Sequence, residues 1–521
     1  MNNAHVLLLE DDPLWVNSVH EVLAPHVQSI HAATSLAEAV TLIDGHYFTV
    51  AIVDISLVIG DPKDSQGMEF LRLLAERKLD EVLVVVVLSA YGNQERLRKA
   101  FRDFHVFDFL SKSDFNAADL LDAIRGALAT QKRLDDLTIE LQSHRALTTL
   151  WERFDWPQRE SAQELTNEFV DLLRRLFPDA SELFLQPMTA GQSGAVVVKA
   201  EPIYGAKSGS PLIVKVGKRD KIEIERDNYN DHIERFISNQ ASTKLRYVPG
   251  RVMGAIAYSL VGPDLGDVRS LAEYFPSASV SDLHSVFDNL FQYTCRRWYE
   301  NREQPRRTRD LVELYEQGLH IHDWEEIWRG MAKVAPDLTA PRLSFAGIEG
   351  DFPNPKRWLS AQNHQIYLPV WLSMTHGDLN EHNILVTDDH HAWLIDFYRT
   401  GTGHILRDMI ELECAIKFSL AGIVDLAAQQ KLEETLLGQA RLAQSPHTPS
   451  DLPYAKAMEA IFYLRKLASD FTDQDMREYF SALLLHTLYL LSLEFLHERD
   501  VNSRARVLLS AAMITGKLSN S

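Results

Sequence analysis

The sequence is poor in cysteine, in long apolar runs and in basic residues. Its only cysteines, Cys295 and Cys414, lie far apart without metal-type neighbours, which excludes a disulfide framework and favours two buried thiols in a reducing cytoplasm. The longest apolar runs, such as residues 82–90, fall well short of the ~20 residues that span a bilayer. A formal net charge of −20 disfavours nucleic acid and anionic membranes as partners. We therefore expect a soluble, cytoplasmic protein.

The chain is also too long for one ordinary core. At 521 residues, against the usual ~100–200 residues per domain, it predicts a multidomain protein. Hydrophobic residues at 45% and charged residues at 24% are typical of globular proteins, so neither a disordered nor a fibrous class is indicated. We expect domains over residues 1–128, 129–180, 181–262 and 263–521.

Residues 1–128 alternate short apolar runs with amphipathic stretches. Continuous Val, Ile and Leu runs such as "HVLLLE", "FTVAIVD" and "VLVVVVLSA" are typical of strands buried on both faces. Amphipathic segments between them indicate helices, so the pattern predicts a doubly wound, five-stranded parallel sheet. In such a sheet the functional site lies at the carboxyl ends of the strands.

Polar residues follow the strands of this predicted sheet. Glu10 and Asp11 come after the first strand, and Asp54 ends the run "VAIVD". Three carboxylates at neighbouring strand ends repel one another unless a hard divalent cation binds them, and Mg²⁺ prefers such oxygen ligands. Ser89 and Lys112 end later runs, and a hydroxyl and an ammonium aimed at the same point suit a phosphoryl group.

This ordered set resembles the receiver domain of two-component response regulators. The resemblance implies that Asp54 accepts a phosphoryl group from a sensor histidine kinase. The implied metal-binding residues are Glu10, Asp11 and Asp54, and the implied switch residues are Ser89, Phe109 and Lys112. Two departures stand out, because the loop after Asp54 is long and Ser113 replaces the usual proline after the lysine.

Residues 129–180 favour helices and form the predicted connector. Leu134, Leu137 and Leu141 recur at helical spacing, but the heptad pattern breaks after about two repeats. A lone amphipathic helix packed on a neighbouring domain and a homodimer seam both fit this pattern. After a break at Pro157, "AQELTNEFVDLLRRLF" predicts another helix.

Residues 181–262 carry a glycine-containing turn and a strand lysine. The turn holds Gly191, Ser193 and Gly194, where backbone amides can approach phosphates closely, and the next strand carries Lys215. A buried lysine of this kind needs a carboxylate to orient it. Glu225 lies ten residues later in a helical pattern and fits the helix phase better than the competing Glu223.

Residues 263–521 contain "MTHGDLNEHNILV" and "AWLID". Asp378 opens a loop, Asn383 follows five residues later, and Asp396 ends a strand. Transfer of a phosphoryl group needs a carboxylate that orients or deprotonates the acceptor hydroxyl and two oxygen ligands for Mg²⁺. These three residues supply that set.

The second half of the chain resembles the aminoglycoside phosphotransferase and choline kinase branch of the bilobal α+β protein-kinase-like fold, and more closely a bacterial kinase-like family named as a ternary-complex-associated domain. The resemblance implies ATP and Mg²⁺ as cofactors. It implies a catalytic base, Asp378; metal ligands, Asn383 and Asp396; a phosphate contact, Lys215; and a loop brace, Asp408. Phe397 and Tyr398 replace the familiar Phe-Gly, and no long activation loop follows, which argues against an ordinary protein kinase.

Together these features predict a response regulator whose receiver controls an ATP- and Mg²⁺-dependent phosphotransferase acting on an unknown acceptor. The alternative is a phosphorylation-switched scaffold whose kinase-like region binds nucleotide or a protein partner without turnover.

Overall fold

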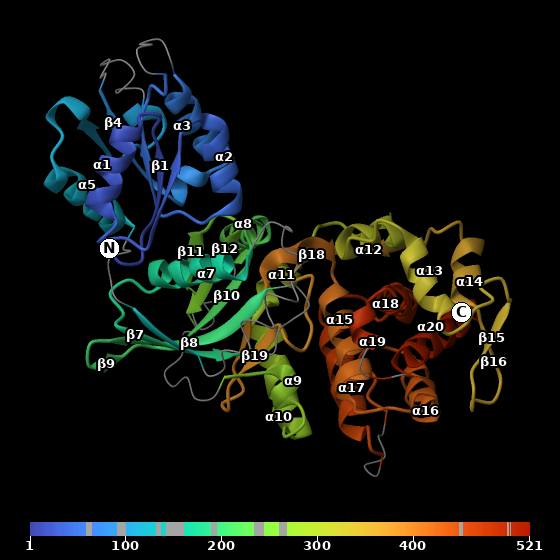
Figure 1. Cartoon of the computed structure of the whole chain (residues 1–521). Helices are drawn as coiled ribbons and strands as arrows, with labels where there is room; N and C mark the ends of the chain where they lie inside the picture. The colour runs from blue at the N-terminus through green and yellow to red at the C-terminus, as the bar shows by residue number, and fades with distance from the viewer. Residues whose placement is uncertain are drawn as a thin grey trace. The chain divides into compact units, whose positions relative to one another are not determined.

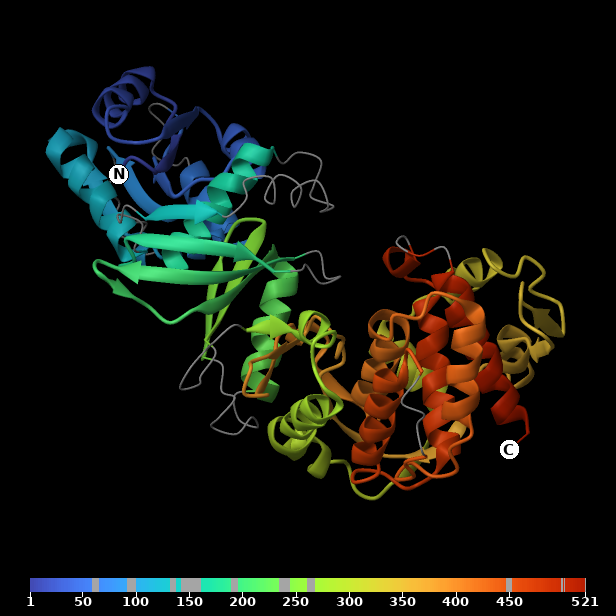
Figure 2. The ribbon, with the colours of Figure 1, turned by 90° about the horizontal axis from the view of Figure 1, so that it is seen from below.

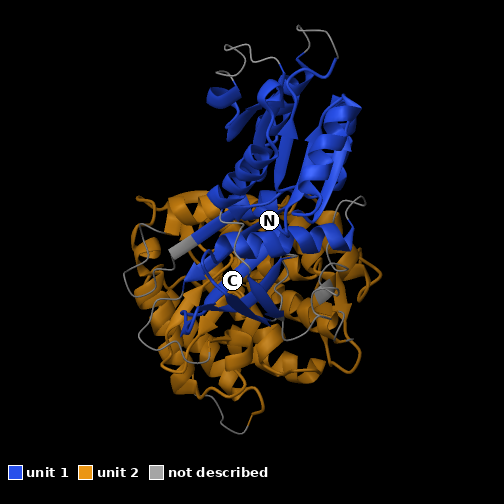
Figure 3. Cartoon of the chain, turned by 60° about the vertical axis from the view of Figure 1, so that its left-hand side comes forward, with its two compact units in different colours: residues 1–224, 244–259 blue, residues 225–243, 260–521 orange. Residues whose placement is uncertain are grey.

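The computed structural model describes residues 1–58, 65–90, 100–131, 137–141, 161–188, 195–233, 244–259, 268–446, 452–497, 500 and 502–520. The chain divides into two compact units, coloured separately in Figure 3. Unit 1 comprises Met1–Ile224 and Lys244–Ser259, and unit 2 comprises Glu225–Thr243 and Leu260–Ser521. None of the helices formed by the described residues combines the length and the apolar character needed to cross a bilayer.

Unit 1 begins with a five-stranded parallel sheet in the order β2-β1-β3-β4-β5. Its elements are β1 (His5–Leu9), α1 (Pro13–Leu23), β2 (Ser29–Ala33), α2 (Leu36–Gly45), β3 (Val50–Val53), α3 (Gln66–Glu76), η1 (Leu79–Glu81), β4 (Val84–Ser89), β5 (Asp108–Ser111), η2 (Lys112–Asp114) and α5 (Ala117–Thr130). Helices α1 and α5 cover one face and α2 and α3 the other (Figure 1). The predicted doubly wound sheet is confirmed.

The alternation of side chains along the strands explains these layers. Leu7 and Leu9 on β1 pack in the core under α2 and α3, whereas Val6 and Leu8 pack in the core under α1 and α5. Because both faces are covered, β3 is apolar throughout, and β1 and β4 are apolar except for His5 at the start of β1 and Ser89 at the end of β4.

The second part of unit 1 is a mixed seven-stranded sheet, ordered β11-β12-β10-β8-β7-β6 with β9 beside β8. Its elements are β6 (Thr138–Leu141), α7 (Ala162–Leu176), β7 (Glu182–Pro187), β8 (Val196–Tyr204), β9 (Lys207–Ser208), β10 (Leu212–Lys218), β11 (Lys244–Pro249) and β12 (Met253–Ser259). Helix α7 packs across β11 and β12, and its apolar face shares one core with the sheet.

Strand β6 lies within the segment that the leucine spacing assigns to a helix. It pairs in parallel with β7, matching Thr138 with Glu182 and Leu141 with Leu185. Leu137 is buried and Ile139 is partly buried against the core of the sheet. More and less buried side chains therefore alternate along residues 137–140, with the period of two that a strand requires. Pairing with β7 outweighs the helical spacing of the leucines.

Helix α8 (Arg219–Asn228) and the π-helical turn η3 (Tyr229–Ile233) follow β10, and the chain passes from unit 1 to unit 2 within α8. The first half of unit 2 contains β13 (Arg269–Ser270), α9 (Leu271–Tyr274), α10 (Val280–Asp288), η4 (Asn289–Thr294), α11 (Arg296–Glu300), β14 (Arg307–Asp310), α12 (Leu311–Leu319), α13 (Trp324–Ala332), β15 (Arg342–Ser344), β16 (Asp351–Pro353), α14 (Pro355–Ala361), β17 (Tyr367–Val370) and β18 (Leu372–Thr375).

The second half of unit 2 contains β19 (Ile384–Val386), β20 (Ala392–Leu394), η5 (Phe397–Arg399), β21 (Gly401–His404), α15 (Arg407–Ala415), η6 (Ile416–Leu420), α16 (Leu426–Leu437), α17 (Ala455–Ala468), α18 (Met476–Leu490), α19 (Glu494–His497) and α20 (Ser503–Ser519). Helix α18 packs against α15 and α20 within the orange and red bundle of Figure 2. Short hairpins flank the bundle, and β18 pairs with β21. The multidomain, mixed α/β architecture is confirmed.

The helix bundle encloses a fully buried ion pair. Arg465 donates two hydrogen bonds to Glu413, at 2.8 and 2.6 Å, and both side chains are inaccessible to solvent. Tyr479 also donates to Glu413, at 2.5 Å. Burial opposes the charge of Glu413, but the guanidinium beside it holds the pKa of this carboxyl below its usual value. The free cysteines Cys295 and Cys414 are both buried, as expected.

Candidate functional site

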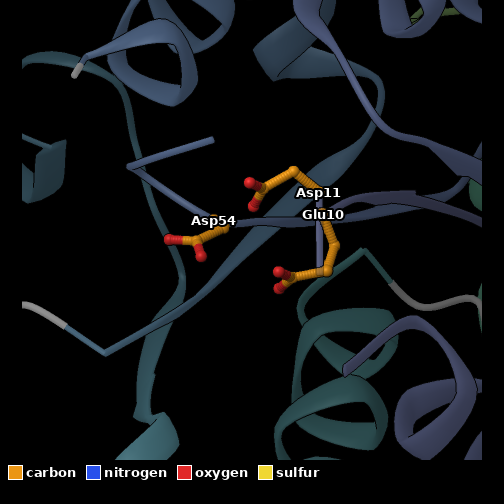
Figure 4. Close-up of side chains that lie close together, drawn as sticks. All are labelled: Glu10, Asp11 and Asp54. Carbon is orange, nitrogen blue, oxygen red and sulfur yellow. The ribbon is translucent and has the colours of Figure 1, made fainter. Parts of the chain in front are cut away.

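The strand-end carboxylates of the first sheet converge on one point. Glu10 and Asp11 follow β1, and Asp54 follows the adjacent β3. One carboxylate oxygen of each lies within 4.8 Å of the others, and the three side chains lie close together in Figure 4. Glu10 is fully buried and Asp54 is 5% exposed. This donor set fits Mg²⁺, which takes carboxylate oxygens and keeps several waters.

Two further strand ends aim at the same carboxylates. The ammonium of Lys112, which follows β5, lies 2.5 Å from Asp54 Oδ2 and 2.8 Å from Glu10 Oε1. The hydroxyl of Ser89, at the end of β4, donates to Asp54 Oδ1 at 2.7 Å. The predicted lysine and hydroxyl thus contact both oxygens of Asp54.

The cluster of Glu10, Asp11, Asp54 and Lys112 holds more acidic than basic side chains. Burial raises the pKa of Glu10 to about 7, although the adjacent Lys112 pulls the pKa down. Burial also lowers the pKa of Lys112, but its contacts with Asp54 and Glu10 outweigh this and keep the pKa above its usual value. One ammonium compensates only one of three carboxylates, so a divalent cation suits the remaining charge.

Three further features predicted for the receiver are Phe109, Ser113 and the long loop after Asp54. Phe109 lies on β5 opposite Val87 and is partly buried in the core under α2 and α3. Ser113 lies in the short turn η2, where its hydroxyl pairs with that of Ser111 at 2.7 Å. Most of the long loop after Asp54, residues 59–64, lies outside the described residues.

Sequence reasoning missed Gly67 at the start of α3. An added Cβ at this glycine would lie 2.0 Å from the carbonyl oxygen of Asp54 and 2.6 Å from the Cα of Ile55. Both obstacles are backbone atoms, so α3 approaches the end of β3 only because residue 67 lacks a side chain. A glycine just after a helix start is a weak signal, since the close approach depends on tertiary packing.

The segment around Asp378 lies between β18 and β19 and is held from α15. The carboxylate of Asp408 is fully buried and accepts the backbone N–H groups of His376 and Gly377, each at 2.9 Å. The hydroxyl of Tyr299 also donates to Asp408, at 2.9 Å. Asp408 therefore anchors the backbone directly before Asp378.

His376 is a neutral structural contact in this loop. Burial lowers the pKa of its imidazole, even though the carboxylate of Asp408 works in the opposite direction. Nε2 lies 3.0 Å from the carbonyl of Ile395, and Nδ1 lies 3.4 Å from the N–H of Asp378. The neutral tautomer protonated at Nε2 satisfies both contacts.

The Asp378 side chain has an amide on one side and a guanidinium on the other. Asn383 Nδ2 donates to the carbonyl of Asp378 at 2.8 Å and to its Oδ2 at 3.0 Å. Arg399 lies 3.9 Å from Oδ1 and also donates to the hydroxyl of Tyr489. Asp378 and Arg399 are each 23% exposed, so the carboxylate can be reached from solvent.

Asp396 directly precedes the turn η5, whose backbone is hydrogen-bonded to side chains of α8. It adopts a left-handed backbone, with φ of 70°, and is 6% exposed. The next residue, Phe397, donates its N–H to Glu225 at 3.3 Å, and its carbonyl accepts the amide of Asn228 at 2.9 Å. Glu225 and Asn228 thus hold the backbone that follows Asp396.

Glu411 on α15 is a buried carboxyl near Asp378 that sequence reasoning missed. Burial raises its pKa to about 8, and the negative charge of Asp378 acts in the same direction. Arg407 and Arg399 oppose this rise. Only the fold brings these groups together, because Glu411 has no distinctive sequence context.

The remaining predicted residues lie in unit 1. Lys215 lies in β10 between Val197 of β8 and Ile256 of β12, and it is 3% exposed. The competing carboxylate Glu223 accepts from Arg219 at 2.8 Å. Gly191, Ser193 and Gly194 lie outside the described residues.

The first sheet matches a known family and known structures. Residues 6–125 match the response regulator receiver domain family, so the chain carries a receiver domain at its N-terminus. A signal receiver domain from an HD domain-containing protein of Pseudomonas fluorescens Pf-5 is 19% identical, covers 24% of this chain and 95% of its own, and has a TM-score of 0.22.

Two further solved structures give similar values. A CheY-like receiver protein from Methanospirillum hungatei JF-1 is 21% identical over 25% of this chain and 97% of its own, with a TM-score of 0.22. The response regulator TrrA from Thermotoga maritima, solved with Mg²⁺ and BeF, is 21% identical over 25% of this chain and all of its own, with a TM-score of 0.21. No curated protein matches the chain significantly.

The larger match covers the third predicted domain and most of the fourth. Residues 180–319 and 344–492 match the family described as Ternary complex associated domain 9. These two segments cover more than half of the 521 residues, and the chain therefore belongs to the Ternary complex associated domain 9 family.

Proposed function

We propose that this response regulator accepts a phosphoryl group on Asp54 and that its receiver controls an ATP- and Mg²⁺-dependent phosphotransferase. The observation that carries the enzymatic part is the loop in which Asp408 holds the backbone before Asp378 while Asn383 binds the Asp378 side chain. We propose four domains: the receiver over residues 1–128, a connector over 129–180, and the two lobes of a kinase-like region over 181–262 and 263–521.

In the receiver, the chemistry is transfer from a phosphorylated donor such as a sensor histidine kinase. A carboxylate oxygen of Asp54 attacks phosphorus, the bond from phosphorus to the donor nitrogen breaks, and an acyl phosphate forms. Glu10, Asp11 and Asp54 would hold Mg²⁺, which neutralises charge on the phosphoryl oxygens. Lys112 and Ser89, already in contact with Asp54, would bind those oxygens, and Phe109 would respond as the switch aromatic.

In the second half of the chain, Asp378 would orient or deprotonate an acceptor hydroxyl. Its carboxylate is reachable, and the Asn383 amide leaves the Asn383 oxygen available for other ligands. Asn383 and Asp396 would hold Mg²⁺ bound to the phosphates of ATP. Lys215 would contact those phosphates together with the turn containing Gly191, Ser193 and Gly194, and Glu225 would position this machinery.

The test of the enzymatic proposal compares wild type with Asp378→Ala in ATP consumption, with Mg²⁺ and candidate acceptor hydroxyl compounds present. Asp388→Ala is the matched control, because the Asp388 side chain is 71% exposed and pairs only with Arg269 among the contacts described. We expect a loss of at least ~100-fold for Asp378→Ala and none for the control. Equal, negligible turnover in all three proteins would support the non-catalytic scaffold instead.

The test of the receiver proposal is acetyl-phosphate labelling in the presence of Mg²⁺. Label should enter wild type and disappear in Asp54→Ala. Label that persists in Asp54→Ala would refute Asp54 as the acceptor.

A further inference from the structure

The two strands that carry Asp54 and Ser89 at one end are bound to the second part of unit 1 at their other end. β3 runs from Val50 to Val53, so Tyr47 lies just before it and Asp54 just after it. β4 runs from Val84 to Ser89, and the turn 78–81 lies before it. In a parallel sheet these beginnings lie together, at the edge opposite the phosphoryl site.

The beginning of β3 is bound to α7. The hydroxyl of Tyr47 donates to Asp171 at 2.5 Å, and the backbone N–H of Tyr47 donates to Glu164 at 2.7 Å. His46 also contacts Glu164, at 3.2 Å. Tyr47 is 1% exposed and Asp171 is 5% exposed, so both groups are withdrawn from solvent. Buried phenol and carboxylate groups need polar partners, and the Tyr47 hydroxyl supplies one to Asp171, which also lies 3.6 Å from Arg175.

The segment before β4 is bound to the start of α8. Two nitrogens of Arg219 each donate to the carbonyl of Lys78 at 3.2 Å, and a third contact ties Arg219 to the carbonyl of Gly250 at 3.0 Å. Lys78 adopts a left-handed backbone, with φ of 53°. From α7, Arg175 donates to the carbonyl of Glu81 at 3.4 Å. Guanidinium groups therefore bridge receiver backbone and the second sheet.

A third link and an adjoining pocket complete this junction. Arg251, just before β12, donates to the carbonyl of Asp44 at 3.1 Å. A pocket of about 460 Å³ opens beside Lys78, Arg219 and Arg251. The junction is thus joined by directional hydrogen bonds, and the pocket lies beside the Lys78 turn. We name these contacts of residues 43–47 and 78–81 with α7, Arg219 and Arg251 the receiver seam.

The seam leads directly into α8. Arg219 is the first residue of this helix, which runs to Asn228 and includes Glu225. Glu225 and Asn228 bind the backbone after Asp396 in unit 2. A displacement of the Lys78 carbonyl would act on Arg219 and hence on the first turn of α8.

We propose that phosphorylation of Asp54 is transmitted along β3 and β4 to the receiver seam and from there to α7 and the first turn of α8. This transmission is a change in structure, so amide hydrogen exchange can measure it even if the protein does not consume ATP. Its consequence for ATP consumption rests on the proposed function.

The experiment measures amide hydrogen exchange in the full-length chain with Mg²⁺, with and without beryllofluoride as a phosphoryl analogue. In wild type we expect the exchange rates of α7 and of residues 219–223 to change by roughly fivefold, the scale set by one hydrogen bond. Asp54→Ala should abolish the change. Tyr47→Phe and Arg219→Gln should each reduce it while leaving the response of residues next to Asp54 intact.

Tyr204→Phe is the matched control, since Tyr204 lies on β8 of the same unit and is 36% exposed. It should respond as wild type does. An exchange response near Asp54 with none in α7 or residues 219–223 would overturn the proposal, and so would an undiminished response in both seam variants. Failure of both beryllofluoride and acetyl phosphate to modify the receiver would overturn it too. ATP consumption is followed in the same samples, so an intact exchange response without turnover would refute only the enzymatic function.

Discussion

Substituting Asp408 by asparagine tests what holds the loop around Asp378. The change keeps the shape of the side chain but replaces one carboxylate oxygen by an NH₂ group. Asp408 accepts from His376, Gly377 and Tyr299, each at 2.9 Å, and is fully buried. One oxygen cannot accept all three donors, so in Asp408→Asn the NH₂ group faces at least one backbone N–H.

The magnitude follows from these contacts. Hydrogen bonds to a charged acceptor contribute ~1.5–3 kcal/mol each, and a buried donor left without a partner costs ~1–3 kcal/mol. Removing a buried charge relieves some desolvation, which offsets part of this loss. The Tyr299 hydroxyl can also rotate to accept from the new NH₂ group. We therefore expect the free energy of unfolding of unit 2 to fall by about 3 kcal/mol.

The assay is urea unfolding followed by tryptophan fluorescence. The tryptophans of unit 2 are Trp298, Trp324, Trp328, Trp358, Trp371 and Trp393, against Trp15, Trp151 and Trp156 in unit 1. The signal therefore reports mainly on unit 2. Asp388→Asn, on the exposed turn, is the control and should change the free energy by less than ~0.5 kcal/mol. A loss below ~1 kcal/mol for Asp408→Asn would refute the view that this carboxylate anchors the loop.

Three further substitutions follow from other contacts. Gly67→Ala forces a Cβ against the Asp54 backbone and should destabilise the receiver by ~2–3 kcal/mol and reduce acetyl-phosphate labelling. Arg465→Met leaves Glu413 buried without its main partner and should lower the stability of unit 2 by ~3–5 kcal/mol in the same urea assay. Glu411→Gln removes a carboxyl whose folded pKa of about 8 lies above its usual value, so its ionisation opposes folding. The variant should gain stability over wild type as pH rises from 5 to 9, by up to ~4 kcal/mol.

Each of these substitutions has its own check. Gly45→Ala places a Cβ where nothing lies within 4 Å and should leave labelling unchanged. Adding Glu413→Leu to Arg465→Met should restore most of the lost stability, because no unpaired charge remains. For Glu411→Gln, a difference from wild type that stays constant between pH 5 and pH 9 would show that the carboxyl does not titrate in this range.

The receiver site could be predicted because its signals are local. Each of its polar residues lies at or just after the end of a strand, and parallel strands bring such ends together without further information. Gly67 could not be predicted in the same way. Its requirement comes from the distance between α3 and the backbone of Asp54, which the sequence does not express.

The loop around Asp378 could be predicted only in part. The spacing of Asp378 and Asn383 is short, and the structure joins their side chains at 3.0 Å. Contacts over long sequence separations were not predictable. Tyr299 reaches Asp408 across 109 residues, and Arg399 reaches Tyr489 across 90. Neither pair follows a periodic pattern, because their proximity depends on how the helices pack.

The segment 129–180 shows how tertiary pairing overrides local preference. Its leucine spacing fits a helix, yet Thr138–Leu141 forms a strand because β7 offers an unpaired edge. In the same segment α7 is the helix that the second pattern predicts, and its carboxylates Glu164 and Asp171 meet Tyr47. The sequence marks α7 as amphipathic but does not indicate which surface it contacts.

The construction of the receiver sheet determines how a change at Asp54 can reach the receiver seam. β3 is hydrogen-bonded to β1 on one side and to β4 on the other, and its residues are fully buried. A strand held in this way in a close-packed interior cannot lengthen or buckle, so a force at Asp54 displaces it as a rigid element. Tyr47 would then move with its backbone, and the short contact with Asp171 would change geometry before any part of the sheet unfolds. The exchange response of α7 should therefore be smaller than that of the residues around Asp54, but it should have the same dependence on beryllofluoride concentration.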